Sequence, residues 1–361
     1  MPEFSYVLTG YAVSMFTVNS CTGQFTASTP ASIGTGYATP QIGAEQMAVD
    51  PLGRFAYVAN LVSNASDQAT ISMYTINSTT GVLTPTTPAT VPTGFFPQEI
   101  VIDPLGRFVY TVNTDDSSVS MFTVNQTTGV LTPTTPASVS TAVPGQMLSI
   151  PVFLTIDPAG KFLYVPESLS TNGAILMFAI DQTTGVLTPT SPATAPVSGI
   201  PFQMNVAPNG KFAYVVNNLS GGADADGVWQ YTVNPVTGIM AQNSPKWVSA
   251  GNGPTGIVVD PTNRFAYVTN RSDNTVSMYT IDASTGNLTL NASTANPTGT
   301  IGAGIEPFRI RFDPSGKFVY VTNESSPASI YTANSDGTLT SAGTTGVATG
   351  GPLSTAFAAG P

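Results

Sequence analysis

The chain contains no histidine and a single cysteine among its 361 residues. The missing histidine removes the commonest general base and the commonest metal ligand, and it excludes a Ser-His-Asp triad. One cysteine excludes a disulfide scaffold and every zinc site that is built from several cysteines. Much of the familiar chemistry of hydrolases and metalloproteins is therefore unavailable to this protein.

Charge is also scarce, since only 8% of the residues are Asp, Glu, Lys or Arg, and the formal net charge is −10. An acidic chain without a basic tract repels nucleic acid. No apolar run is long enough to form a transmembrane helix, which needs about 18 to 20 residues. Because 41% of the residues are hydrophobic, the chain can still bury a core, which excludes a disordered protein. We expect a folded protein with no nucleic-acid partner and no transmembrane segment.

The chain does contain an internal repeat. The phrase Asp-Pro-x-Gly-Arg/Lys-Phe-x-Tyr-Val-x-Asn returns with small variations, and a shortened copy opens the chain at Phe4. Tyrosines 50 to 54 residues apart mark the copies, at Tyr6, Tyr57, Tyr110, Tyr164, Tyr214, Tyr267 and Tyr320. A period of this length is typical of solenoids and propellers, in which each repeat is one unit of secondary structure.

Each repeat holds four short runs in which apolar and polar residues alternate. In one of them the runs are Gln98–Ile102, Phe108–Asn113, Val119–Val124 and Val130–Thr132. Such alternation, broken by Asp-Pro-x-Gly and by a second glycine turn, indicates antiparallel strands joined by tight turns. No segment shows the period of a helix with caps. The chain is therefore predicted to be all-β.

Seven four-stranded units predict a seven-bladed β-propeller of antiparallel blades. The C-terminal segment aligns with the innermost strands of the other units, so the last blade is expected to combine three N-terminal strands with one C-terminal strand. We expect a single domain over residues 1–361. Its blades are predicted at about 44–93, 97–145, 151–198, 201–250, 254–300, 307–349, and 352–361 joined with 1–33.

At Tyr267-Val268-Thr269-Asn270 and Tyr320-Val321-Thr322-Asn323 the chain resembles the YVTN-repeat propellers and the broader lactonase-like seven-bladed family. The resemblance covers essentially the whole chain and implies the propeller fold. It implies a lactonase, similar to phosphogluconolactonases and muconate-lactonising enzymes, or an exported protein without a known reaction. The enzymes of this family are thought to use His, Glu and Arg at the mouth of the central channel, and no histidine is available here.

The innermost strands supply the candidate site residues. Alternate positions on these strands face away from the packed side and should line the channel. The polar residues there, with one carboxylate in an adjoining loop, are Gln46, Glu99, Gln203, Asn205, Glu306, Arg309 and Arg311. Repeats that diverge at a few converging positions indicate a ligand site, although a water-filled channel also tolerates such variety.

Most of the negative charge is predicted on the top face, which carries the loops from second to third strands and from fourth strands to the next blade. These carboxylates either keep the loops solvated or form a working acidic surface. Asp224 and Asp226 alternate in the longest such loop. They are the candidate ligands for Ca²⁺, the one cofactor considered, but the ligand ladder of an EF-hand is absent.

The missing histidine favours an exported, non-enzymatic binding, scaffold or surface protein. Its top face and channel mouth would bind a protein, a glycan, or a small anionic or cationic ligand. Scarce charge and abundant Thr, Ser, Asn and Gly suit an extracellular, cell-surface or periplasmic location. The alternative is a lactone hydrolase or related isomerase in which Glu99 is the base and Arg309 or Arg311 holds a carboxylate or oxyanion. In either case Glu99→Gln is expected to leave stability nearly unchanged.

Overall fold

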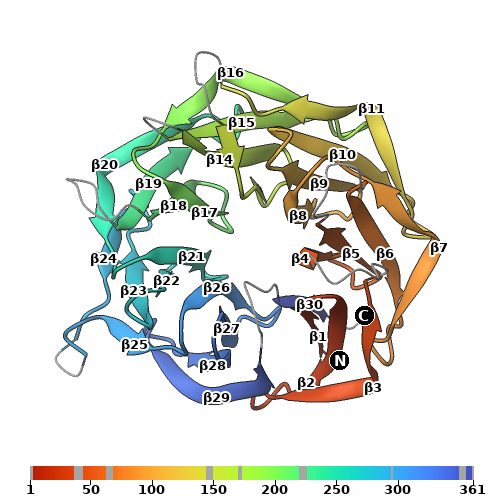
Figure 1. The fold of residues 1–361 in the computed structure, drawn as a ribbon. Coiled ribbons are helices and arrows are strands. Elements are labelled where there is room, and N and C mark those ends of the chain that lie inside the picture. Colours follow the sequence, from red (N-terminus) through yellow and green to blue (C-terminus); the bar gives the residue numbers. More distant parts are fainter. Residues whose placement is uncertain are drawn as a thin grey trace.

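The computed structural model describes residues 3–35, 44–61, 68–143, 149–169, 173–218, 226–293, 296–348 and 355–359. Their strands form seven separate sheets that are arranged as blades around a central axis (Figure 1). The predicted all-β seven-bladed propeller is confirmed. The described residues include no helix, and hence none of the length and apolarity needed to cross a membrane.

Each blade is an antiparallel sheet whose strands follow one another outward from the channel. The innermost strands are β4 (Ala44–Val49), β8 (Pro97–Ile102), β17 (Pro201–Val206), β21 (Pro254–Val259), β26 (Pro307–Phe312) and β30 (Thr355–Ala359), and one blade has two short pieces instead, β12 (Ser149–Pro151) and β13 (Thr155–Ile156). The second strands are β1 (Glu3–Thr9), β5 (Phe55–Asn60), β9 (Phe108–Asn113), β14 (Phe162–Leu169), β18 (Phe212–Asn217), β22 (Phe265–Asn270) and β27 (Phe318–Asn323).

The third and fourth strands complete each blade on the outside of the ring. The third strands are β2 (Ala12–Val18), β6 (Thr70–Ile76), β10 (Ser118–Val124), β15 (Ala174–Ile180), β19 (Gly227–Val233), β23 (Thr275–Ile281) and β28 (Pro327–Ala333). The fourth strands are β3 (Phe25–Gly34), β7 (Leu83–Pro92), β11 (Leu131–Ser140), β16 (Leu187–Pro196), β20 (Met240–Ser249) and β29 (Leu339–Ala348), while β24 (Leu288–Leu290) and β25 (Thr300–Gly302) share this place beside β23.

The ring closes as the sequence predicts, with the C-terminal strand β30 paired to β1 in a blade of order β3-β2-β1-β30. Ala356 lies opposite Tyr6, just as Arg311 lies opposite Tyr320 in the preceding blade. The red N-terminal strands and the blue C-terminal strand therefore share one sheet (Figure 1). This pairing covers the edge of β1, which the N-terminal strands alone would leave open.

The outer strands are longer than the sequence suggested. The predicted run ended at Thr132, before Pro133, but β11 continues to Ser140 and contains two prolines. Proline can occupy this strand because it is the outer edge of the blade, where one side of the backbone has no partner strand. The register shifts between Ser120 and Phe122, so a bulge accommodates the irregular segment.

The repeat phrase joins each blade to the next. The buried Tyr57 hydroxyl donates a hydrogen bond of 2.9 Å to the carbonyl of Gly129, and Tyr320 donates one of 2.8 Å to Gly23 across the closure. Gly129 has a positive φ of 73°, and a Cβ there would lie 2.4 Å from the Phe55 ring. The glycine is therefore required both by the backbone conformation and by the close approach of the neighbouring blade.

The β14 blade departs from this pattern at Glu167. In the β9 blade, Asn113 stands at the equivalent position and donates 2.9 Å to the Ser120 hydroxyl. Glu167 is fully buried and instead accepts a hydrogen bond from the hydroxyl of Ser149 on β12. Burial raises the pKa of Glu167 to about 7, although the hydrogen bonds from Ser149 and Thr141 oppose the shift. The carboxyl is therefore a titrating group at the point where the innermost strand is split.

The pH dependence of stability tests this assignment. Because the pKa of Glu167 is about 7 when folded and 4.5 when free, folding takes up a proton between these values. Glu167 should then make the free energy of unfolding fall as pH rises from 4.5 to 7, by on the order of 3 kcal/mol. In urea melts, Glu167→Gln should lose this contribution and keep the separate fall of the same sign that Glu3 adds through its own pKa of about 7.

Asp115→Asn, a change of an exposed carboxylate, is the control and should keep the wild-type pH profile. An unchanged profile in Glu167→Gln would contradict the assignment.

Candidate functional site

The inner strands run from the top face to the bottom face, where they enter the Asp-Pro turns. Glu99 and Arg309 lie four residues before these turns, and Arg311 lies two residues before. Because side chains two residues apart share one side of a strand, Arg309 and Arg311 occupy successive levels of the same wall. The sequence thus sets two layers of side chains around the axis.

An ion pair spans the channel in the upper layer. Arg309 Nη1 on β26 lies 2.8 Å from Glu99 Oε2 on β8, and the two side chains are 7% and 5% exposed. Even along the shorter path around the ring, the β30 and β4 blades stand between these two strands. The contact therefore depends on two long side chains reaching across the axis. Its burial makes each charge dependent on the other.

Aromatic rings enclose this pair. The Arg309 guanidinium carbon is 4.9 Å from the ring centroid of Phe153 and 5.7 Å from that of Phe308. Phe202 completes the group, with centroids 4.5 Å from Phe153 and 5.6 Å from Phe308. Phe153 comes from the gap between β12 and β13, so the split strand supplies the ring on which the guanidinium rests. Stacking of this kind stabilises a desolvated arginine.

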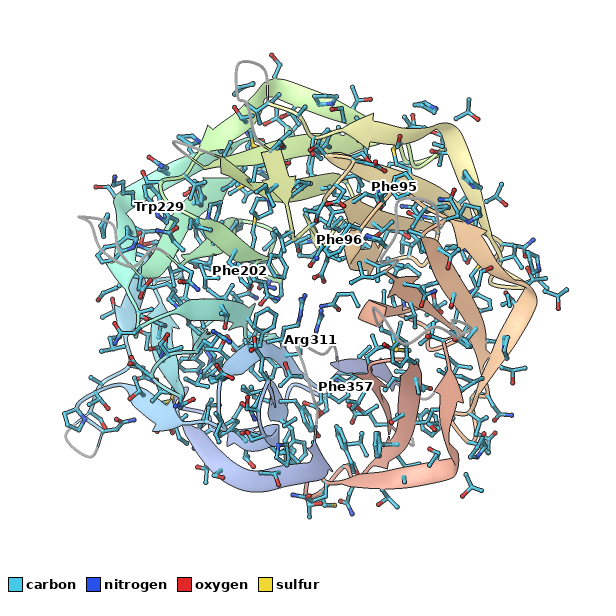
Figure 2. All side chains as sticks on the ribbon, in the orientation of Figure 1. Phe95, Phe96, Phe202, Trp229, Arg311 and Phe357 are labelled. Atoms are coloured by element: carbon cyan, nitrogen blue, oxygen red, sulfur yellow. The ribbon has the colours of Figure 1, made fainter. Side chains whose placement is uncertain are left out.

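A cavity of about 430 Å³ lies in the lower layer. Gln203, Asn205 and Arg311 are its polar side chains, and Figure 2 shows Arg311 reaching into the centre of the ring. The remaining wall is largely aliphatic or aromatic. It includes Ala48, Val49, Val101, Ile102, Val258, Phe312, Pro314, Ala356 and Phe357. The volume is within the range of small-molecule sites.

Arg311 is the cation of this cavity. Its side chain is 39% exposed, and Nη2 lies 3.8 Å from Glu99 Oε1. Its Nε is buried without a hydrogen-bond partner among the described residues. Burial lowers the pKa of Arg311, Glu99 opposes that shift and Arg309 adds to it, but a guanidinium stays charged at neutral pH. Glu99 thus lies between two arginines, of which one is buried and the other faces the cavity.

The predicted site residues separate into three groups. Gln203, Asn205 and Arg311 line the cavity. Gln46, Glu99 and Arg309 are buried in the inner strands, with exposures of 0%, 4% and 6%.

Glu306 lies outside the channel, on the top face. Its carboxylate accepts a hydrogen bond of 3.0 Å from Arg271 Nη2 and one of 2.7 Å from the Ser325 hydroxyl. Arg271 also contacts Glu324 at 2.6 Å, so this cluster links the β21 and β26 blades.

Sequence reasoning missed the aromatic part of the site. Phe153, Phe202 and Phe308 were not among the candidate residues. The available signal was that Phe202 and Phe308 directly precede the channel residues Gln203 and Arg309. The proximity of these rings could not be read from a single strand, because they come from three different blades.

The proposed calcium ligands are only partly described. Asp224 lies outside the described residues. Asp226 accepts a hydrogen bond of 2.8 Å from the backbone N–H of Gly253. Within the described ranges no group of three acidic or cysteine side chains is close enough to hold a metal ion. Calcium binding at this loop stays a prediction.

The model of the family described as "Lactonase, 7-bladed beta-propeller" matches residues 5–148 and 201–357. The chain therefore belongs to this family.

A 6-phosphogluconolactonase of Pectobacterium carotovorum is 36% identical over 93 residues, which are 24% of this chain and 27% of that protein. The chain thus spans about a quarter of the length of this curated relative. The solved periplasmic gluconolactonase of Pseudomonas aeruginosa is 17% identical, covers 99% of this chain and 100% of its own, and has a TM-score of 0.74. A protein from Lactobacillus plantarum is 20% identical over 99% of both chains, with a TM-score of 0.75. The two solved structures share the fold.

These findings correct the functional prediction. The expectation of a binding or surface protein without enzymatic activity is wrong, because the family and its named relatives support the lactonase alternative. The error came from treating the missing histidine as decisive. Acid-base catalysis can also use a carboxylate, and the channel retains Glu99 and two arginines.

The geometry also revises the expected stability of Glu99→Gln. This change would leave Arg309 buried without its counter-charge, which typically costs about 3 to 5 kcal/mol. Arg309→Met should destabilise similarly, and the double variant should recover a large part of the loss because neither charge is then left alone. Urea denaturation of the four proteins measures this coupling.

Arg311→Met provides the comparison, because Arg311 is partly exposed and lies farther from Glu99. Its loss of stability should be smaller than that of Arg309→Met. If the double variant lost as much unfolding free energy as the Glu99→Gln and Arg309→Met losses added together, the two buried charges would not be energetically coupled, and this prediction would be contradicted.

Proposed function

We propose that the protein is a lactone hydrolase that acts in the central channel. The observation that carries this proposal is the position of Arg311, which presents a guanidinium to the channel cavity beside the Glu99 carboxylate. Membership of the lactonase family and the names of the relatives support it. A location outside the cytoplasm, supported only by composition, fits the same proposal.

The reaction needs water, stabilisation of negative charge and two proton transfers. Water loses one proton to a base as it adds to the lactone carbonyl carbon, which gives a tetrahedral oxyanion. Collapse of this intermediate breaks the bond between the acyl carbon and the ring oxygen, and the departing oxygen takes up a proton. The product is an open hydroxy acid, which ionises to the carboxylate. Charged side chains of the channel can stabilise the oxyanion and transfer the protons.

Arg311 is the residue that would hold the carbonyl oxygen. A cation in an enclosed site stabilises the developing oxyanion more strongly than the neutral carbonyl, and this difference accelerates the reaction. The apolar wall opposite Arg311 excludes part of the bulk water that would otherwise screen this interaction. Because the charge sits in place before the substrate arrives, little reorganisation is needed during the reaction.

Glu99 would serve as the base. A water held near Arg311 could transfer a proton to the Glu99 carboxylate, which would then return it to the ring oxygen. The Glu99 carboxylate lies between the two guanidinium groups, at 2.8 Å from Arg309 and 3.8 Å from Arg311. Arg309 acts as a positioning residue, since it holds Glu99 from the buried side.

Lactone hydrolysis can be followed with a pH indicator. The wild-type protein should open D-glucono-δ-lactone or its 6-phosphate faster than the spontaneous reaction. Arg311→Met should lower kcat/KM by about 10²- to 10³-fold, the usual effect of removing an oxyanion-stabilising group. Arg271→Met is the matched control, because Arg271 lies in the ion pairs of the top face, and it should keep wild-type activity.

Turnover no faster than the spontaneous reaction across γ- and δ-lactones, both neutral and anionic, would contradict the proposed function. Equal loss of activity in Arg311→Met and Arg271→Met would contradict the role given to Arg311.

A further inference from the structure

The carboxamides of Gln203 and Asn205 have fixed orientations. Gln203 Oε1 accepts a hydrogen bond of 3.1 Å from the backbone N–H of Ile257, and Asn205 Oδ1 accepts one of 3.3 Å from the backbone N–H of Val259. A backbone N–H can bind only the oxygen of a carboxamide, so the assignment of oxygen and nitrogen is forced. The NH₂ group of each side chain is then left as the available polar end.

Gly256 permits this arrangement. A Cβ at this position would lie 3.1 Å from Gln203 Oε1, 2.7 Å from the Phe308 carbonyl and 2.8 Å from the Thr269 hydroxyl. A side chain here would clash with the Phe308 backbone carbonyl and would crowd the Gln203 carboxamide. The glycine therefore explains why two neighbouring blades can hold a carboxamide between them at the channel wall.

The three polar side chains of the cavity thus offer hydrogen-bond donors. Gln203 and Asn205 offer their NH₂ groups, and Arg311 offers a guanidinium. The Nε of this guanidinium has no hydrogen-bond partner among the described residues. They come from the β17 and β26 blades, which flank the β21 blade on either side. Such a set complements an anion, because an anion supplies acceptors and charge together. It does not suit a cation.

The cavity also has a preferred entrance. Its lining reaches Val49, Ile102 and Phe312, which directly precede the bottom-face turns, and Pro314, which is exposed within one of those turns. On the other side, the Glu99–Arg309 pair and Phe153 are almost completely buried. The path to Arg311 through the described residues therefore starts at the bottom face, on the side opposite the loops of the top face.

We propose that this cavity is an anion site, filled from the bottom face, in which Arg311 and the NH₂ groups of Gln203 and Asn205 bind one carboxylate or phosphate. The inference rests on the proposed function only in assigning this anion to the carboxylate of the hydroxy-acid product, which forms from the carbonyl that Arg311 would hold. Binding itself requires no catalysis. The polar groups of the site select charge, while the apolar wall accepts the remainder of a small ligand.

Anion binding is tested by isothermal titration with D-gluconate, with inorganic phosphate, and with the neutral D-sorbitol as the matched comparison. Gluconate or phosphate should bind and raise the melting temperature, and sorbitol should do neither. Arg311→Met should weaken anion binding by about 10- to 100-fold, the usual range for a charge-assisted hydrogen bond. Gln203→Glu and Asn205→Asp, which replace a donor by an acceptor, should each weaken it about tenfold or more.

Arg271→Met is again the control and should bind as the wild type does. Equal affinity for gluconate and sorbitol, no binding of either anion, or anion binding that survives Arg311→Met would overturn the proposal. Gluconate binding that depends on Arg311 in a protein that hydrolyses no lactone would uphold the anion site and reject the proposed function. Hydrolysis combined with anion binding that is independent of Arg311 would reject the anion site alone.

The entrance is tested with bulky thiol labels. Cys21 is exposed, so the variants carry Cys21→Ser. A fluorescein maleimide attached to Pro314→Cys, at the bottom face, should slow gluconate association several-fold. The same label on Ile305→Cys, which is 55% exposed in wild type and lies on the top face, should leave the rate unchanged. Slower association with the top-face label alone would reverse the assigned direction of entry.

Discussion

The arrangement of this channel follows from the counter-charge that the buried Glu99 obtains. Arg309 crosses the axis to reach it at 2.8 Å. Taking both charges out of water is costly, and the pair persists only because the two groups compensate each other and the guanidinium rests on aromatic rings. The ring of Phe153 comes from the gap at which the inner strand of its blade is split. One interaction therefore involves three blades and fills the upper channel.

The chemistry of the site arises where the repeat is broken. Identical blades would place identical side chains around the axis, and such a channel would have no preferred orientation for a ligand. Here Asn205 and Arg311 occupy a level at which the other blades have alanine, valine or threonine. The conserved part of each repeat, such as the Tyr57 bond to Gly129, keeps the blades in register. The fold thus supplies a rigid frame on which a few inner positions can vary.

Most of the fold could be predicted because the same pattern of strands and turns occurs seven times in the sequence. The alternation of side chains along Pro307–Phe312 also identified Arg311 as a channel residue, since a strand has a period of two. The meeting of Glu99 with Arg309 could not be predicted in the same way. It depends on the diameter of the ring and on the reach of two long side chains, and neither is encoded in the pattern of one strand. The orientation of Gln203 likewise depends on a backbone N–H from another blade.

The function was the weakest prediction for a related reason. Catalytic groups were sought by residue type, so the absence of histidine outweighed the presence of Glu99 between Arg309 and Arg311. Their closeness is a property of the assembled ring. A carboxylate can act as a base where no histidine is available.

The most direct test of this account is a crystal structure of the protein soaked with D-gluconate. The account predicts that the carboxylate of the ligand contacts Arg311 in the lower channel, with the NH₂ groups of Gln203 and Asn205 turned toward it and the Glu99–Arg309 pair intact above. Gluconate bound on the top face, or a cavity that holds only water at saturating ligand, would contradict it.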